Sequence, residues 1–123
     1  MSDPLDDSID AIEALLKSKR YRFNDELALQ GGIAQVFTKA QLDFEAEVRL
    51  SPTDRIDFIV GAVGIEVKVR GTDEAAHMQL LRYAEHDRIL GLLLVSGTKR
   101  IGDIPPLMRG KPVRVVYVER VIF

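Results

Sequence analysis

The sequence predicts an α/β protein of the α+β kind, in which helices flank a mixed β-sheet. Three observations lead to this fold class. Apolar residues recur at helical spacing in two segments before residue 41 and in one near residue 80. The segments between residues 44 and 118 include five short runs that alternate or are continuously apolar, as strands do. The resulting order is α-α-β-β-β-α-β-β.

The first helix is expected at about residues 4–18. Asp3-Pro4 places a capping residue before a proline in the first turn. The apolar positions that follow at helical spacing are Leu5, Ile9, Ile12, Leu15 and Leu16. A break at residues 21–24 then separates this helix from the next.

A second helix is expected at about residues 25–40, with Asn24 as its candidate cap. Its apolar stripe consists of Leu29, Ile33, Val36, Phe37 and Ala40. The Gly31-Gly32 pair lowers the stability of this helix and predicts the close approach of another backbone.

The remaining elements are expected to be strands around one helix. Residues 44–50 alternate as a half-exposed strand does, and residues 51–54 form a turn that Asp54 shapes. Strands at about 55–60 and 63–70 precede a helix at about 74–86. The apolar run 89–96 predicts a strand buried on both faces, and a basic connection at 98–110 leads to a last strand at 113–118.

Composition indicates an ordinary globular protein. The chain has 123 residues, enough for one domain with a core and too few for two. It has no cysteine, no apolar run near the ~20 residues of a membrane span and an acidic N-terminus unlike a signal peptide. We therefore expect one domain, 1–123, in a cytoplasmic protein without a membrane span.

The charge is unevenly distributed. The net charge of −2 argues weakly against a nucleic-acid partner. However, the first 16 residues hold five acidic and no basic side chains, so the other 107 residues carry 17 basic and 14 acidic ones. The body of the protein is mildly basic.

The hairpin RIDFIVGAVGIEVKVR, residues 55–70, carries charge where its neighbours are apolar. A two-residue turn at Gly61-Ala62 sets Asp57 opposite Glu66 on one face, ~5 Å apart, which is destabilising. Lys68 shares that face. The opposite face is expected to belong to the core and consists of Ile56, Phe58, Val60, Ile65, Val67 and Val69.

Two interpretations of these charges are open. In the first, the charges simply mark the solvated side of the hairpin, as charged residues on one face most often do. Alternatively, a divalent cation joins the carboxylates, since Mg²⁺ takes oxygen ligands from carboxylates, a carbonyl and waters. The β-branched and aromatic neighbours and the helix that follows favour a metal site.

These residues resemble a known signature. Asp57…Glu66-Val67-Lys68 resembles that of the PD-(D/E)XK nucleases, with Pro-Asp reduced to Ile56-Asp57. Gln79 and Tyr83 are similar to the Gln-x-x-x-Tyr motif of the RecB-like and lambda-exonuclease-like branch. Residues 24–97, about two-thirds of the chain, resemble the restriction-endonuclease-like core of order α-β-β-β-α-β, with residues 1–20 as a helical extension.

The resemblance implies a role for each residue. Asp57, Glu66 and the Val67 carbonyl would bind Mg²⁺ or Mn²⁺, and Lys68 would position a water and stabilise charge on the phosphate. Glu26 would be a further ligand, unless it only complements the helix dipole. Gln79 would lie near the metal ligands or the DNA backbone, and Tyr83 would brace the site. In the alternative, Tyr83 belongs to the core and Gln79 is its polar neighbour.

Basic side chains near these positions are candidates for nucleic-acid binding. Arg55, two residues before Asp57 on the same face, would contact phosphate or pair with an acid. The other candidates are Arg70, Lys99 and Arg100, the last two in the basic connection, which could equally be an ordinary solvated loop.

We therefore expect a small Mg²⁺-dependent deoxyribonuclease, of the kind found in phages or mobile elements. Its size predicts structure- or end-dependent cleavage, or targeting by a protein partner, over sequence-specific cleavage. A dimeric Holliday-junction resolvase is the nearest competing function, and the apolar residues Val121-Ile-Phe123 would suit such a homodimer. The motif is also compatible with a non-catalytic DNA- or protein-binding module that keeps a nuclease fold, and with an unrelated interaction domain.

Overall fold

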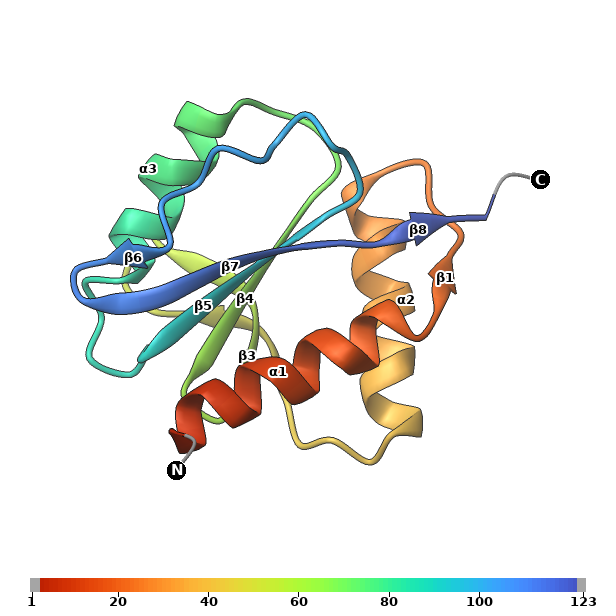
Figure 1. The fold of residues 1–123 in the computed structure, drawn as a ribbon, viewed down its shortest axis with the longest axis horizontal. Coiled ribbons are helices and arrows are strands. Elements are labelled where there is room, and N and C mark those ends of the chain that lie inside the picture. Colours follow the sequence, from red (N-terminus) through yellow and green to blue (C-terminus); the bar gives the residue numbers. More distant parts are fainter. Residues whose placement is uncertain (1–2, 122–123) are drawn as a thin grey trace.

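The protein consists of three helices around a mixed six-stranded sheet, which confirms the predicted fold class (Figure 1). The computed structural model describes residues 3–121, so Ile122 and Phe123 of the apolar C-terminal segment lie outside the described residues. The helices are α1 (Pro4–Lys17), α2 (Glu26–Lys39) and α3 (Asp73–Tyr83). No helix within residues 3–121 has the length and apolar character needed to cross a membrane.

The sheet has the order β2-β3-β4-β5-β7-β6. Its strands are β2 (Glu45–Arg49), β3 (Arg55–Val60), β4 (Val63–Lys68), β5 (Gly91–Ser96), β6 (Leu107–Met108) and β7 (Lys111–Tyr117). Strands β4, β5 and β7 run parallel, and antiparallel pairs extend the sheet at both edges. Separately, β1 (Arg20–Tyr21) pairs in parallel with β8 (Glu119–Arg120).

The sequence did not predict the three two-residue strands β1, β6 and β8. Each has only two residues, so none carries an alternating pattern of its own. The helix expected at 74–86 ends at Tyr83, and the strand expected at 63–70 ends at Lys68. Within the described chain, the other predicted helices and strands are present with bounds shifted by at most two residues.

Side-chain caps begin all three helices. The Asp3 carboxylate accepts a hydrogen bond from the Leu5 N–H at 2.9 Å, and Thr72 Oγ1 accepts one from Ala75 N at 3.1 Å. The cap of α2 is Asp25, which accepts from Ala28 N at 2.8 Å. The prediction of Asn24 as the cap is therefore wrong by one residue, and Asn24 instead accepts a hydrogen bond from Arg120 at 2.6 Å.

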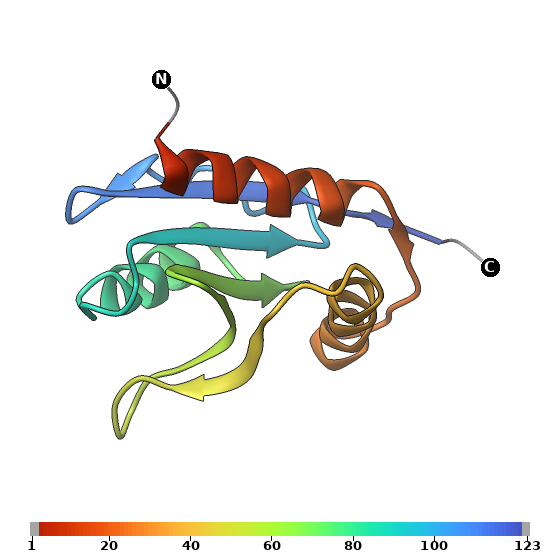
Figure 2. The same cartoon turned by 90° about the horizontal axis from the view of Figure 1, so that it is seen from below.

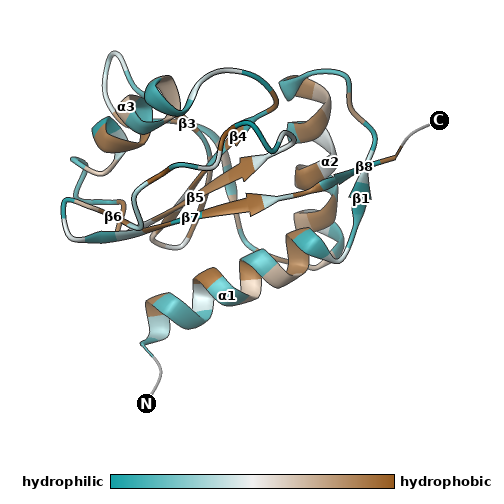
Figure 3. Ribbon diagram, turned by 45° about the horizontal axis from the view of Figure 1, so that its top comes forward, coloured by the Kyte–Doolittle hydropathy of each residue, from teal (hydrophilic) through white to brown (hydrophobic). Residues whose placement is uncertain are grey.

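Hydrophobic clusters cover both faces of the sheet. On one face, α1 and α2 pack against β3, β4, β5 and β7 through residues that include Ile12, Ile33, Phe58, Leu93 and Val116. On the other, α3 packs through residues that include Leu80, Tyr83, Ile59, Leu92 and Leu94. Figure 2 shows α1 lying along β7, and Figure 3 shows hydrophobic colouring along β5 and β7. All six residues of β5 are buried, as its apolar run predicted.

One residue of the predicted core face of the hairpin lies on the other side. Phe58, Val60, Ile65, Val67 and Val69 join the α1–α2 cluster as expected, but Ile56 packs in the α3 cluster. The regular β3–β4 pairing ends at Phe58, and Glu47, beside this part of β3, has a left-handed φ of 52°. Strict alternation therefore fails between Ile56 and Phe58.

The Gly31-Gly32 pair does not meet another backbone, so that prediction is wrong. A Cβ on Gly32 would lie 3.1 Å from Cδ1 of the Tyr21 ring, whereas a Cβ on Gly31 would meet nothing within 4 Å. The close neighbour is thus a side chain, at Gly32 alone. Gly31 carries only the backbone-entropy penalty of a helical glycine.

We expect Gly31→Ala to raise the free energy of unfolding by about 1 kcal/mol, because alanine favours the helix and its Cβ enters open space. Gly32→Ala should gain less or lose stability, because the Tyr21 ring would have to shift. Urea denaturation of the two variants measures the difference. Equal stabilisation by both would contradict the packing described for Tyr21.

Candidate metal centre

The backbones of β3 and β4 stop pairing at Asp57 and Glu66, and two carboxylates take over their hydrogen bonds. Regular pairing runs from Val60↔Val63 to Phe58↔Ile65, which confirms the predicted register and places Asp57 opposite Glu66. Beyond it, Asp57 N donates to Glu66 Oε1 at 3.3 Å, and Val67 N donates to Asp57 Oδ2 at 2.8 Å. Each carboxylate therefore satisfies an N–H of the opposite strand.

This carboxylate pair is not a solvated hairpin face. The Glu66 residue is only 4% exposed and Asp57 is half-buried. Burial, followed by the negative charge of Asp57, raises the pKa of Glu66 to about 8. Burial also raises the pKa of Asp57, although the Val67 N–H opposes this. Since the two acids interact and both pKa values are raised, they titrate as a pair.

Lys68 supplies a positive charge beside the pair. Its Nζ lies 3.6 Å from Glu66 Oε2, and its side chain is 22% exposed. As the period of two predicts, Lys68 follows Glu66 on the same face of β4. Its charge favours the ionised forms of both carboxylates but does not offset their burial.

Helix α3 brings the predicted Gln79 and Tyr83 to the same place. The Tyr83 hydroxyl lies 3.2 Å from Glu66 Oε1 and 2.9 Å from the Arg55 carbonyl oxygen, and it accepts a hydrogen bond from Gln79 Nε2 at 2.9 Å. Burial, followed by the charge of Glu66, raises the pKa of Tyr83, which keeps the phenol protonated. The hydroxyl has one proton, so it donates either to Glu66 Oε1 or to the Arg55 carbonyl oxygen at any one time.

Glu26 lies in the first turn of α2 and is half-buried. Its negative charge raises the pKa of Asp57, so the two side chains are close enough to interact electrostatically. Within residues 3–121, however, no group of three His, Cys, Asp or Glu side chains is placed to hold a metal ion. The acidic donors gathered at the centre are thus Asp57 and Glu66.

The donor set suits a hard divalent cation. Two carboxylates in contact supply anionic oxygens, and Mg²⁺ needs only one or two of these because waters complete its coordination. Val67 lies between Glu66 and Lys68 in the chain. A cation would also offset the repulsion between the two carboxylates, which contributes to the raised pKa of Glu66.

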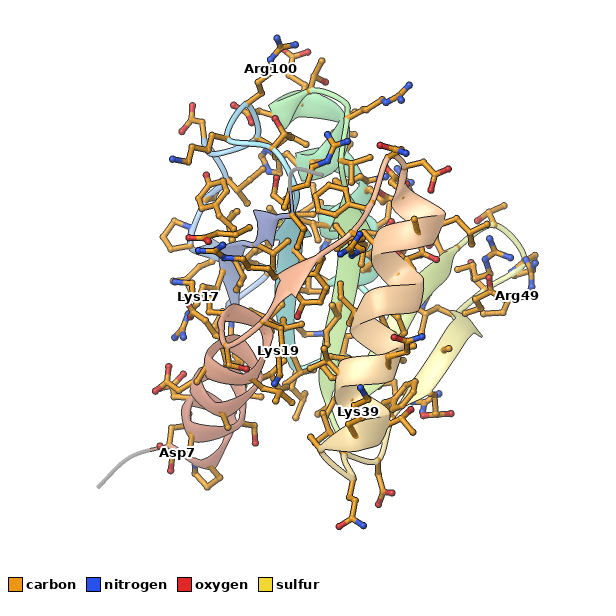
Figure 4. All side chains as sticks on the ribbon, turned by 90° about the vertical axis from the view of Figure 1, so that its right-hand side faces the viewer. Asp7, Lys17, Lys19, Lys39, Arg49 and Arg100 are labelled. Atoms are coloured by element: carbon orange, nitrogen blue, oxygen red, sulfur yellow. The ribbon has the colours of Figure 1, made fainter. Side chains whose placement is uncertain are left out.

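The predicted nucleic-acid-binding residues lie at the surface. The side chains of Arg55, Arg70, Lys99 and Arg100 are all exposed. Arg55 begins β3 and Arg70 follows β4, and both strands carry the carboxylates. Lys99 and Arg100 belong to the loop after β5, with Arg100 marked at the top of Figure 4.

Sequence reasoning missed a polar cluster that fastens α3 to the start of β3. Asp54 shapes its turn as predicted, since its carbonyl accepts from Leu50 N at 2.8 Å. In addition, its buried carboxylate bonds to His86 Nε2 at 3.1 Å and to Arg82 Nε at 3.2 Å. Arg82 is 28 residues and His86 is 32 residues from Asp54 in the sequence, so no local spacing could have indicated them.

Comparisons with known proteins add no relatives to this picture. A scan of protein-family models, a search of curated proteins and a search of solved structures each found no match to this chain. The interpretation of the centre therefore depends on its own residues and geometry.

We expect the metal-free protein to lose stability as the pH rises from about 5 to about 8. The raised pKa values of Glu66 and Asp57 mean that the folded state holds protons that the unfolded chain has released, so folding is penalised by up to about 1.4 kcal/mol per pH unit for each proton. Glu66→Gln should flatten this slope and be more stable than the wild type at pH 8. Urea denaturation in EDTA across this range measures both effects.

The control for this experiment is Glu47→Gln, at an exposed position of β2. It should keep the wild-type slope. A slope in Glu66→Gln as steep as that of the wild type would show that Glu66 ionises normally in the folded protein.

Removing the Asp54 charge should loosen α3. Since both carboxylate oxygens accept charge-assisted bonds, Asp54→Asn should lower the free energy of unfolding at pH 7 by about 1–3 kcal/mol. The His86 hydrogen bond, against a smaller opposing effect of burial, holds the pKa of Asp54 below its usual value. The charge thus stabilises the fold above the ordinary aspartate pKa. The stability difference between the wild type and Asp54→Asn should shrink as pH falls through the lowered pKa of Asp54.

The matched control in urea denaturation is Asp87→Asn, at an exposed position. An equal loss of stability in both variants would contradict the role of Asp54.

Proposed function

We propose that this protein is a small nuclease that hydrolyses DNA phosphodiester bonds with the help of Mg²⁺ or Mn²⁺. The observation that carries the proposal is the pair of half-buried Asp57 and buried Glu66, with Lys68 Nζ 3.6 Å from Glu66. Two adjacent carboxylates destabilise the hairpin unless a positive charge neutralises them. A divalent cation is the ligand that their oxygens suit.

The order of the elements supports the same proposal. Between residues 26 and 96 the chain follows the order α2-β2-β3-β4-α3-β5, which is the order that the resemblance to PD-(D/E)XK nucleases implies. Glu26, Asp57, Glu66, Lys68, Gln79 and Tyr83 occupy the expected elements. A non-catalytic module would have no need to keep all four charged residues of this set.

Asp57 and Glu66 would hold the cation, together with the Val67 carbonyl, and Glu26 would add an acid from α2. When bound, a divalent cation polarises a phosphoryl oxygen and lowers the pKa of a coordinated water. Because the pKa of Glu66 is raised to about 8, this carboxyl would have to lose a proton to hold the cation, so loading would be favoured as pH rises toward 8.

The other side chains would orient the reacting groups and stabilise charge on the phosphate. Lys68, partly exposed beside Glu66, would position the attacking water and stabilise negative charge that develops on the phosphate. Tyr83 holds the Glu66 carboxyl in place through its hydroxyl, and Gln79 orients that hydroxyl. Arg55, Arg70, Lys99 and Arg100 would bind the DNA backbone around the centre.

We expect purified protein to cleave labelled DNA with Mg²⁺ or Mn²⁺ and not with EDTA. Asp57→Asn removes an anionic ligand and Lys68→Ala removes the positive charge, so each should lower the cleavage rate by at least about 100-fold. Gel assays on linear duplex, single-stranded and four-way-junction DNA measure the rates. The preferred substrate also separates an end-dependent nuclease from a junction resolvase.

The matched control is Asp43→Asn, an exposed aspartate of the α2–β2 loop that should leave cleavage unchanged. Isothermal titration with Mg²⁺ or Mn²⁺ adds a readout that does not depend on the substrate. Folded wild-type protein that binds neither metal and cleaves none of the three substrates would refute the nuclease and favour a binding module.

A further inference from the structure

A groove separate from the metal centre runs between α2 and the segment that links α1 to β1. It has a volume of about 800 Å³. Figure 4 shows Lys19 between the two helices and Lys39 at the far end of α2. Lys19, Arg20, Arg22 and Lys39 line this groove, and no acidic residue of the described chain does. In a protein with more acidic than basic side chains, such a lining is a local concentration of positive charge.

Two of these cations have no counter-ion in the described part of the chain. Arg20 pairs with Glu119 at 3.2 Å, but neither Lys19 nor Lys39 forms an ion pair with any residue of 3–121, and both are exposed. Lys17, which is close in sequence, pairs instead with Glu13 at 2.8 Å. The two lysines on the groove are therefore available to an anionic ligand.

The α2 side of the groove consists mostly of small or polar residues. Ala28, Gly31, Gly32, Gln35 and Lys39 share one helix face, and Val36 and Ala40 complete this side. Since a Cβ on Gly31 would meet nothing within 4 Å, the helix backbone is open to close approach there. The one aromatic residue in the described lining, Tyr21, is 3% exposed, with its hydroxyl bonded to the Leu16 carbonyl at 2.8 Å. This lining therefore offers no exposed ring on which a base could stack.

The groove runs along α2 and reaches the helix turn that carries Glu26. It extends along the helix from Lys39, in the last turn, to Ala28, in the first. A helix of 14 residues is about 20 Å long, which is enough for a few nucleotides. The first turn also carries Glu26, whose charge acts on Asp57. One end of the groove is therefore at the same helix end as the candidate metal centre.

We propose that this groove binds the sugar-phosphate backbone of single-stranded DNA, without reading its sequence, and leads the strand toward the metal centre. This inference rests on the proposed nuclease function. A volume of about 800 Å³ is that of a pocket for a small molecule, and this size suits one extended strand. Two lysines without an acidic partner in residues 3–121, and a lining without a stacking ring, predict binding through phosphates alone.

The test is binding of a fluorescent oligothymidylate of about 12 nucleotides, followed by anisotropy in EDTA at several salt concentrations. Lys19→Gln/Lys39→Gln should weaken binding about 10- to 100-fold at low salt. It should also reduce the slope of log K against log salt by about 1.4, because two phosphate contacts are lost. Both substitutions are at exposed positions, so the variant should fold.

The charge-matched control is Arg88→Gln/Arg109→Gln. Both arginines are exposed and pair with glutamates, Glu45 and Glu85, away from the groove. Figure 1 shows the β6–β7 turn, which holds Arg109, at the opposite side of the molecule from β1. This variant should keep the wild-type affinity and slope. Equal losses in both double variants would overturn the groove as the binding site.

A second variant tests the shape of the groove without changing its charge. Gly31→Leu fills the open space beside α2 and favours the helix, so it should fold at least as well as the wild type yet bind the oligonucleotide about tenfold more weakly. Gly31→Ala should bind as the wild type does. Unchanged affinity in Gly31→Leu would overturn the proposal.

Because binding is measured in EDTA, it is independent of cleavage. Groove-dependent binding by a protein that never cleaves would support the groove and refute the nuclease. Metal-dependent cleavage with unchanged oligonucleotide affinity in the groove variants would support the nuclease and refute the groove. Capture of polyglutamate in place of DNA, lost in Lys19→Gln/Lys39→Gln, would assign the groove to an acidic protein partner and overturn our proposal.

Discussion

A buried and a half-buried carboxylate between diverging strands are the constraint on which the candidate site depends. Where β3 and β4 part, the N–H groups of Asp57 and Val67 lose their strand partners, and the opposite side chains accept their hydrogen bonds. This arrangement brings Asp57 and Glu66 into one low-dielectric site, raises both pKa values and places Lys68 beside them. Locally unfavourable electrostatics within an otherwise consistent fold are typical of functional sites.

Helix α3 holds this arrangement by polar contacts as well as by packing. Two hydrogen bonds join it to the segment that leads into Asp57, from Arg82 to Asp54 and from Tyr83 to the Arg55 carbonyl, and His86, just after the helix, adds a third to Asp54. Tyr83 also contacts Glu66 on β4. The same helix therefore sets the separation of the two strands and the position of their carboxylates, which explains why its polar face is as important as its apolar one.

Helix α2 connects the two candidate surfaces. Its buried face, with Leu29, Ile33 and Phe37, anchors it to the sheet. Its first turn brings Glu26 toward Asp57, and the face with Gly31 and Lys39 lines the basic groove. At Gly32 the missing side chain leaves room for the Tyr21 ring, whereas Gly31 faces open space in the groove.

The sequence by itself determined the order of the main elements, the hairpin register and the gathering of Asp57, Glu66 and Lys68 on one face. Periodicity and turn chemistry are local, so residues a few positions apart suffice to predict them. Only the tertiary structure decided that Ile56 packs beside α3, that Asp25 caps α2, and that Asp54 bonds to Arg82 and His86. It also decided that Lys19 and Lys39 line one groove. These features depend on strand bending and on contacts between segments far apart in the chain, and no local pattern encodes either.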